Sequence, residues 1–180
     1  VGLATGDRTQ LDVDLTGSGD PFRFASDFVV DAAASRAIVS QALDGEVVAV
    51  DLATGARSIF SAPMRGTGPL IGSPRAAALD ASHGRVLVID GGNAAIDAID
   101  LATGDRSILS DASHGGGPPF TGPLLDVTVD DARGLAYATD AEFVASKFVG
   151  RVVAVDLASG DRAVVSSASR GTGPTFQFAS

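Results

Sequence analysis

The dodecapeptide IDLATGDRSILS, which spans Ile99–Ser110, recurs along this chain of 180 residues. Near copies stand at Val50–Ser61 (VDLATGARSIFS) and Val155–Ser166 (VDLASGDRAVVS), and a more divergent version, VGLATGDRTQLD, occupies residues 1–12. The aligned leucines are 49, 49 and 56 residues apart, at Leu3, Leu52, Leu101 and Leu157. A repeat period of about 40 to 50 residues is typical of propellers and solenoids, so the content of one repeat decides the fold.

One repeat contains four short apolar segments separated by turns. In residues 74–110 the segments are RAAALD, RVLVID, IDAIDL and DRSILS, with Gly, Ser and Asn residues between them. No segment shows the sustained three- and four-residue apolar spacing of an amphipathic helix. Four short antiparallel strands per repeat predict the blade of a β-propeller, and therefore an all-β fold.

The predicted blades define the domain organisation. Complete blades are expected at about residues 24–61, 74–110 and 124–166, with partial blades at 1–12 and 176–180, in one propeller segment covering 1–180. Three blades do not close a ring, because propellers typically contain at least about four. Three interpretations remain open: a piece of a longer propeller, a ring closed by a second copy of the chain, or an open arc.

The repeated dodecapeptide has the features of a tight hairpin between the third and fourth strands. Asp100 suits the first position of a turn, where its carboxylate accepts backbone N–H groups. Gly104 suits the left-handed conformation that closes the hairpin. The arginine that follows this glycine by two residues (Arg8, Arg57, Arg106 or Arg162) is expected to form an exposed ion pair with the turn Asp, worth at most about 1 kcal/mol. The motif is therefore interpreted as structural.

The stretch VLVIDGGNAAIDAIDLATG, residues 86–104, resembles the bacterial β-propeller repeats of the NHL/YVTN type. In those repeats a strand ending in Asp or Asn precedes a Gly/Asn turn and a hairpin of the "-ID-xATG" kind. The resemblance covers nearly the whole chain. It implies a propeller fold and, commonly, a secreted or periplasmic location, but no single function, because the fold carries binders, enzymes and scaffolds.

Composition excludes several classes of function. The net charge of −9 argues against nucleic-acid binding, which needs a basic face. No apolar run is long enough to form a transmembrane helix. The chain has no cysteine, so it has no thiolate nucleophile, disulfide or cysteine-bound metal.

The first candidate site lies in the loops that join successive blades. In a propeller these loops share one face with the loops joining strands two and three, here called the inter-blade-loop face. Three of these loops have a basic residue before a Gly-x-Gly sequence, at Arg65, His114 and Arg170, and the first loop has Thr16 there. Together these residues could form a positive arc that holds a carboxylate or a sugar acid. The alternative is that each side chain caps its own loop.

The second candidate is the long loop DAEFVASKFVG, residues 140–150, where the extra residues of the third repeat fall. It carries Glu142, Phe143, Lys147 and Phe148. Two exposed phenylalanines would suggest a contact surface for a protein partner. They could equally pack down onto the blade.

The third candidate is a metal site. Asp12, Asp14 and Asp20 have an oxygen-rich spacing faintly like that of a calcium loop, but Arg23 stands where an EF-hand has its closing Glu. Asp90 and Asp140 are also possible ligands, although capping of their turns is the simpler interpretation. In the related gluconolactonase propellers a metal is held by Glu, Asn and Asp near the axis. The only asparagine here, Asn93, falls in a predicted surface turn, so that pattern cannot be matched.

The sequence therefore predicts a non-catalytic binding module of a secreted or envelope protein, using its inter-blade-loop face. Its expected partners are a protein or a small anionic ligand, and no cofactor is expected apart from the possible calcium. Two alternatives remain open. One is a lactonase- or lyase-like enzyme with its site partly outside this segment, and the other is a purely structural repeat module.

Overall fold

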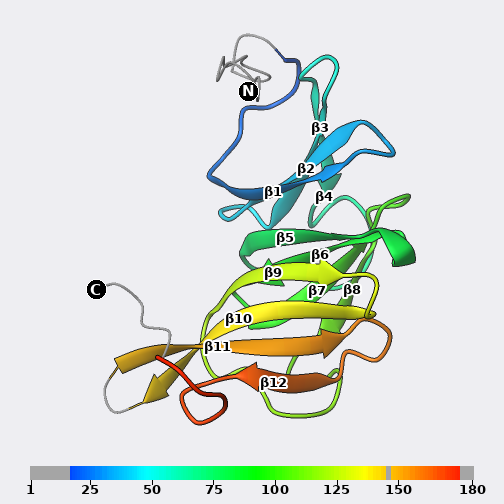
Figure 1. Cartoon of the computed structure of the whole chain (residues 1–180). Helices are drawn as coiled ribbons and strands as arrows, with labels where there is room; N and C mark the ends of the chain where they lie inside the picture. Colours follow the sequence, from blue (N-terminus) through cyan, green and yellow to red (C-terminus); the bar gives the residue numbers. More distant parts are fainter. Residues whose placement is uncertain (1–16, 145–146, 175–180) are drawn as a thin grey trace, which may run out of the picture.

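The computed structural model describes residues 17–144 and 147–174, which form three four-stranded antiparallel sheets (Figure 1). Blade 1 contains β1 (Ala25–Asp31), β2 (Arg36–Gln41), β3 (Glu46–Asp51) and β4 (Arg57–Ser61). Blade 2 contains β5 (Pro74–Asp80), the 3₁₀ turn η1 (Ala81–His83), β6 (Arg85–Asp90), β7 (Ala95–Asp100) and β8 (Arg106–Ser110). Blade 3 contains β9 (Leu124–Asp130), β10 (Leu135–Val144), β11 (Lys147–Asp156) and β12 (Arg162–Ser166). The predicted all-β fold of four-stranded blades, in an incomplete ring, is confirmed.

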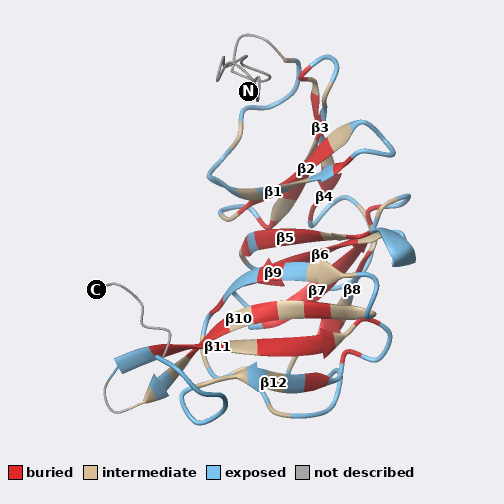
Figure 2. Cartoon of the chain, viewed as in Figure 1, coloured by how far each residue is buried: buried red, intermediate tan, exposed pale blue. Residues whose placement is uncertain are grey.

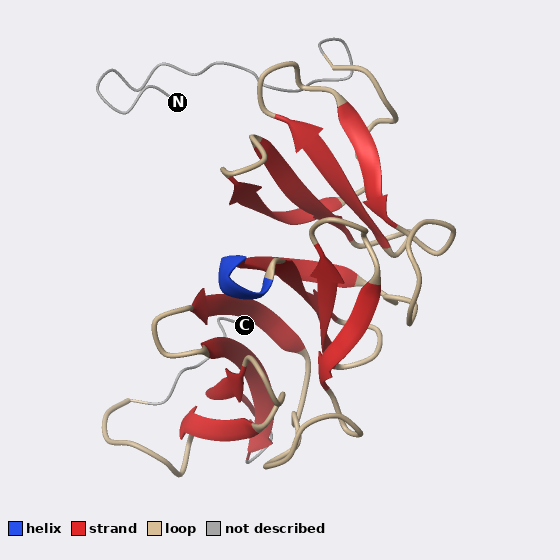
Figure 3. Cartoon of the chain, turned by 90° about the vertical axis from the view of Figure 1, so that its right-hand side faces the viewer, coloured by secondary structure: helices blue, strands red, loops and turns tan. Residues whose placement is uncertain are grey.

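The blades follow one another along an arc (Figure 3). The first strands β1, β5 and β9 contact one another across the blade boundaries, whereas the fourth strands mainly contact their own third strands. Buried Ala76, Ala77 and Ala78 in β5 allow this close approach, because their side chains add little bulk between the sheets. The inner strands therefore converge on an axis and the outer strands diverge.

The hydrophobic core lies between the sheets (Figure 2). Ile38 and Val47 of blade 1 pack with Val86 and Val88 of blade 2. A second cluster joins blades 2 and 3 and includes Leu87, Ile89, Ile96, Val153 and Val155. Burial on both faces explains why the middle strands are apolar at nearly every position instead of alternating with polar residues.

The hairpins between the third and fourth strands have the predicted geometry. Asp100 Oδ1 accepts hydrogen bonds from the backbone N–H of Ala102 at 2.9 Å and from that of Thr103 at 2.8 Å. These bonds, with one from the Thr103 hydroxyl, hold the pKa of Asp100 below its usual value. Gly104 has a φ of 78°, in the left-handed region, and the same pattern recurs at Asp51 and Asp156. The structural interpretation of the motif is confirmed.

The arginine of this motif does not form the expected exposed ion pair, and that prediction was wrong. Arg106 is buried and points to the preceding blade, where its Nη1 donates to Ser61 Oγ, Ala62 O and Arg65 O, each at 2.8 Å. Its Nε donates to Pro69 O at 2.7 Å. The guanidinium therefore organises the loop that leaves blade 1. The charge is satisfied by backbone carbonyls, which leave no signal in the sequence.

A second set of arginines links the opposite ends of the blades. Arg36 Nε donates to Asp31 Oδ2 at 2.9 Å, and its Nη2 donates to Leu101 O of blade 2 at 2.8 Å. Arg85 makes the equivalent contacts with Asp80 and with Leu157 O of blade 3.

In the part of the chain that the structure describes, no helix is long and apolar enough to cross a membrane.

Candidate functional site

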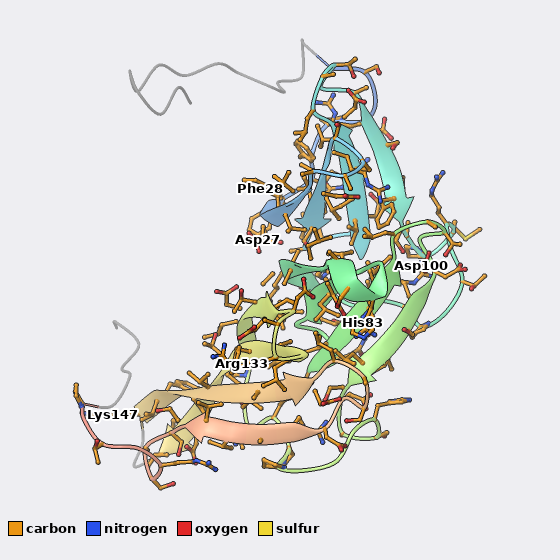
Figure 4. The ribbon with its side chains drawn as sticks, turned by 45° about the vertical axis from the view of Figure 1, so that its right-hand side comes forward. Asp27, Phe28, His83, Asp100, Arg133 and Lys147 are labelled. Atoms are coloured by element: carbon orange, nitrogen blue, oxygen red, sulfur yellow. The ribbon has the colours of Figure 1, made fainter. Side chains whose placement is uncertain are left out.

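The inter-blade-loop face has a hollow of about 520 Å³ where the first strands of all three blades begin. We call it the axial hollow; it is lined by Phe24, Ser26, Asp27, Ala42, Leu43, Ser73, Arg75, Ala76, Leu125 and Asp126. Figure 4 shows Asp27, near the start of β1, on the opposite side of the molecule from Asp100, which ends β7. The axial hollow therefore lies on the face where loops of all blades converge.

Phe24 is the most unusual residue of the axial hollow. Its φ is 64°, in the left-handed region that disfavours side chains, and 70% of the residue is exposed. A register irregularity between Ala25 and Asp27 follows it, and the Phe24 carbonyl accepts a hydrogen bond from Ala42 N at 3.2 Å. Bulges of this kind re-aim side chains, and strained backbone concentrates at functional sites. Blades 2 and 3 have Ser73 and Pro123 at the corresponding position.

The charged groups of the axial hollow are one guanidinium and two carboxylates. Arg75 is exposed and lies over the backbone of Gly91, so close that an added Cβ at Gly91 would overlap it. Asp27 Oδ2 accepts from Ala77 N and Asp126 Oδ1 from Val127 N, both at 2.9 Å. Each carboxylate is fixed by the backbone through one oxygen. Apolar walls with a few oriented polar groups are typical of binding sites.

The predicted basic residues lie in three successive loops and are not brought together. Arg65 and Arg170 each end a turn that follows a fourth strand, bridged to Ala62 and Ser167 respectively. His114 occupies the equivalent turn, and its Nδ1 lies 2.9 Å from Asp111 Oδ1. The fourth strands diverge from the axis, so the turns are spread around the rim. Anion binding by these residues stays a prediction.

The predicted long loop after Asp140 is instead a β-hairpin, and that part of the prediction was wrong. Strands β10 and β11 continue to Val144 and Lys147, and Phe143 pairs directly with Phe148. The two rings meet edge to face with centroids 5.1 Å apart, and the residues are 64% and 54% exposed. We call residues 141–144 and 147–150 the arm; Glu142 and Lys147 lie on it too, with Lys147 exposed. Of the two alternatives that the sequence left open, the phenylalanines are exposed, and their use as a contact surface stays a prediction.

The acidic residues proposed as metal ligands have other partners, are exposed to solvent, or lie outside the described part. Asp12 and Asp14 fall outside the described residues, and Asp20 is exposed. Asp90 accepts from Gly72 N at 2.8 Å and Ser73 N at 3.1 Å. Asp140 accepts from Arg151 Nε at 2.8 Å, and this contact raises the pKa of Arg151.

These bonds support the capping interpretation of Asp90, because its carboxylate holds the incoming loop in place. Within residues 17–144 and 147–174, no group of three or more His, Asp or Glu side chains is arranged to hold a metal ion. Calcium binding that involves Asp12 and Asp14 stays a prediction.

Asp97 is a buried acid that sequence reasoning missed. It is 2% exposed in β7, on the face packed against blade 1, and its carboxylate has no hydrogen-bond partner among the described residues. Burial, with repulsion from Asp90 and Asp111, raises its pKa to about 7. The equivalent residues Val48 and Val153 are apolar, so the signal was an acid at an apolar position of the repeat. Asp97 does not line the axial hollow.

The sequence reasoning also missed the aromatic and charged lining of the axial hollow. Phe24 and Leu43 belong to blade 1, Arg75 to blade 2 and Leu125 to blade 3, so the lining forms only where the three blades converge. The repeated Phe-x-Phe of FRFAS (residues 22–26) and FQFAS (residues 176–180) was the available signal. Phe22 packs against the outer face of blade 1, so only the second Phe of the described pair reaches the hollow.

Comparison with known proteins identifies the fold but does not identify a family. No protein-family model matches the chain, and no curated protein matches its sequence. Its structure is similar to a chain of a nidogen/laminin complex, with a TM-score of 0.62 and 14% identity, covering 82% of this chain and 49% of that one. It is also similar to a gluconolactonase from Xanthomonas campestris, with a TM-score of 0.60 and 15% identity, covering 82% of this chain and 48% of that one.

Hydrazine synthase from Kuenenia stuttgartiensis has a TM-score of 0.57 and 10% identity, with 85% of this chain and 38% of that chain covered. The chain thus spans half or less of the length of these proteins. At these identities the likeness shows the fold alone. The two propellers among these structures support the propeller fold, whereas the NHL/YVTN type expected from the sequence is not matched. The chain has the architecture of an incomplete β-propeller.

Proposed function

We propose that this chain is a binding module that captures a protein partner at the axial hollow. The conformation and exposure of Phe24 carry the proposal. A left-handed φ on an aromatic residue costs about 1–2 kcal/mol, and an exposed ring gains nothing from burial. Neither feature stabilises the blade, so both are explained if the ring is held out for a partner.

The surroundings of Phe24 favour a protein over a small molecule. Leu43 is 70% and Leu125 38% exposed, so the hollow offers a broad apolar surface rather than an enclosed cavity. Such patches mark protein contacts on soluble proteins. The carboxylates of Asp27 and Asp126 and the net charge of −9 favour a partner segment with basic residues beside an apolar side chain. The nidogen/laminin structure supports this proposal as a propeller solved with a protein partner.

Photo-crosslinking from the rim of the hollow tests the proposal. In the parent protein a benzophenone amino acid replaces Leu43. Crosslinked proteins are quantified for this parent and for two variants of it, one with Phe24→Gly and one with Met64→Ser. Met64 is a matched control, because it is 97% exposed in a loop of the same face but outside the axial hollow. We expect a small set of partners that the Phe24→Gly variant loses and the Met64→Ser variant keeps.

The same variant separates binding from a structural role. Glycine adopts a φ of 64° without strain, so Phe24→Gly is expected to leave stability unchanged or to raise it by about 1 kcal/mol. Partners shared equally by all three proteins would overturn the proposal. So would a loss of stability in Phe24→Gly, because it would assign the ring to packing.

A further inference from the structure

The loop that leaves each blade, here called the exit loop, contains a socket for an arginine. After β4, Ser61 Oγ, Ala62 O and Arg65 O accept hydrogen bonds from the Arg106 guanidinium of the next blade. After β8, Ser110 Oγ, Asp111 O and His114 O accept from Arg162 at 2.6, 2.7 and 2.9 Å. Each socket consists of one serine hydroxyl and two carbonyls. Each is filled from the fourth strand of the following blade.

The third exit loop is built in the same way. Ser167 N donates to Arg170 O at 3.0 Å and Arg170 N to Ser167 O at 3.3 Å, as in the turn between Ala62 and Arg65. Ser166 holds the position of the socket serine. Among residues 17–144 and 147–174, no guanidinium donates to Ser166 Oγ, Ser167 O or Arg170 O. The third socket is formed but unfilled by the described part of the chain.

A glycine of the exit loops gives a second, independent indication. At Gly68 and Gly117 an added Cβ would overlap the carbonyl oxygens of Arg106 and Arg162, because the next hairpin lies directly on the loop. Gly173 occupies the same position with a left-handed φ of 119°, and nothing lies within 4 Å of its added Cβ. The space beside Gly173 is therefore open, as it must be for the hairpin of a following blade to lie on the third exit loop.

The sheet face beside this socket is uncovered. Val165 is 45% exposed, whereas Phe60 and Leu109, its equivalents in blades 1 and 2, are 7% and 8% exposed beneath the following blade. Strand alternation places Phe143 and Phe148 of the arm on this same face, in line with Tyr137 and Val152. We call these residues the open face: Tyr137, Phe143, Phe148, Val152 and Val165.

The occupant that fits is a blade hairpin with an arginine two residues after its turn glycine. The three such hairpins in the described part are already used, because Arg57 donates to Gly19 O and Arg106 and Arg162 fill the first two sockets. The sequence LATGDR at residues 3–8 carries the same pattern, with Arg8 two residues after Gly6, and lies outside the described residues. This chain also covers 49% and 48% of the length of two similar chains, so a second arc of equal size would match their length.

We propose that the open face binds a second copy of this chain and that Arg8 of that copy fills the third socket. The contact is head to tail, and such contacts form a closed ring when the rotation between copies closes; two arcs of this size are expected to close through two such contacts. The proposal does not depend on a partner at the axial hollow.

Sedimentation velocity and light scattering of the full chain at micromolar concentrations test it. We expect a species of about 36 kDa, twice the 18.0 kDa of one chain. Arg8→Ala removes the guanidinium, and Val165→Asp places a charge on the open face without altering the core. Each is expected to raise the dissociation constant at least about tenfold. Arg65→Ala is the matched control, because its exposed side chain takes no part in a socket.

Circular dichroism of each variant confirms that the blades remain folded. A single 18.0 kDa species at all concentrations would refute the proposal. A dimer that neither Arg8→Ala nor Val165→Asp weakens would place the contact elsewhere and refute it too. Weakening by Val165→Asp alone would overturn the role of Arg8 in the socket.

Discussion

Replacing Asp97 by valine is expected to remove a pH-dependent weakness from the interface between blades 1 and 2. The unfolded chain releases this proton near pH 4, whereas burial raises the pKa in the folded chain to about 7. Between these values the folded chain binds one more proton than the unfolded chain, so its stability falls as the pH rises. At about 1.4 kcal/mol per pH unit, the loss reaches about 4 kcal/mol once the pH exceeds 7. Asp97 is 2% exposed, so solvent screening does not reduce this figure substantially.

Urea unfolding of the wild type and of Asp97→Val, followed by circular dichroism between about pH 4 and pH 8, measures this difference. Near pH 4 the variant is expected to be more stable by about 1–3 kcal/mol, the usual penalty for burying an unpaired neutral polar group. By pH 8 the advantage should grow by about 4 kcal/mol, because only the wild type then buries a charge. The control is Met64→Ser, which changes an exposed residue that does not titrate, so its difference from the wild type should not vary with pH. An advantage of Asp97→Val that is constant or shrinks as the pH rises would refute the reasoning.

Three further substitutions test the contacts that hold the arc together. Arg106→Ala should lower the free energy of unfolding by about 3 kcal/mol or more in urea titrations, because four carbonyl and hydroxyl acceptors lose a charged donor. The control, Arg65→Ala, should change this free energy by less than about 0.5 kcal/mol. Asp140→Asn should lower it by about 3–5 kcal/mol in the same assay, because Arg151 is only 6% exposed and would become an uncompensated buried charge. Thr103→Ala should lower the free energy of unfolding by about 0.5–1.5 kcal/mol, seen as a small drop in the thermal midpoint. The reason is that the Thr103 hydroxyl is hydrogen-bonded to both Asp100 and Asp105.

The features that sequence predicted are those whose causes are local. Asp100, Thr103 and Gly104 form a turn within six residues, so their identities alone determine the hydrogen bonds. Outside the arm, the strand boundaries are also set locally, because Gly and Asp residues interrupt short apolar runs. Because the chain consists of repeats, the strand pattern of one repeat and the repeat period are together sufficient to predict the propeller architecture.

The features that sequence missed depend on distant backbone or on small register changes. Arg106 binds carbonyls of Ala62 and Arg65, and a carbonyl is the same in every residue. The arm looked like a loop because Ala and Ser residues interrupt its apolar pattern, yet pairing with the neighbouring strand extends it to Val144 and Lys147. The axial hollow needs three repeats and a bulge beside Phe24, which no single segment encodes.

The arginine sockets also order the events of synthesis. Arg106 lies 44 residues after the Ala62 carbonyl that it binds, and Arg162 lies 51 residues after that of Asp111. At a ribosomal rate of about 5–20 residues per second, each exit loop waits roughly 2–10 s for its arginine to be made. A nascent blade therefore emerges with an unfinished edge, and the smallest unit that completes it is the blade together with its successor. Folding on the ribosome is expected to advance one repeat at a time, with each new fourth strand completing the loop that precedes its blade.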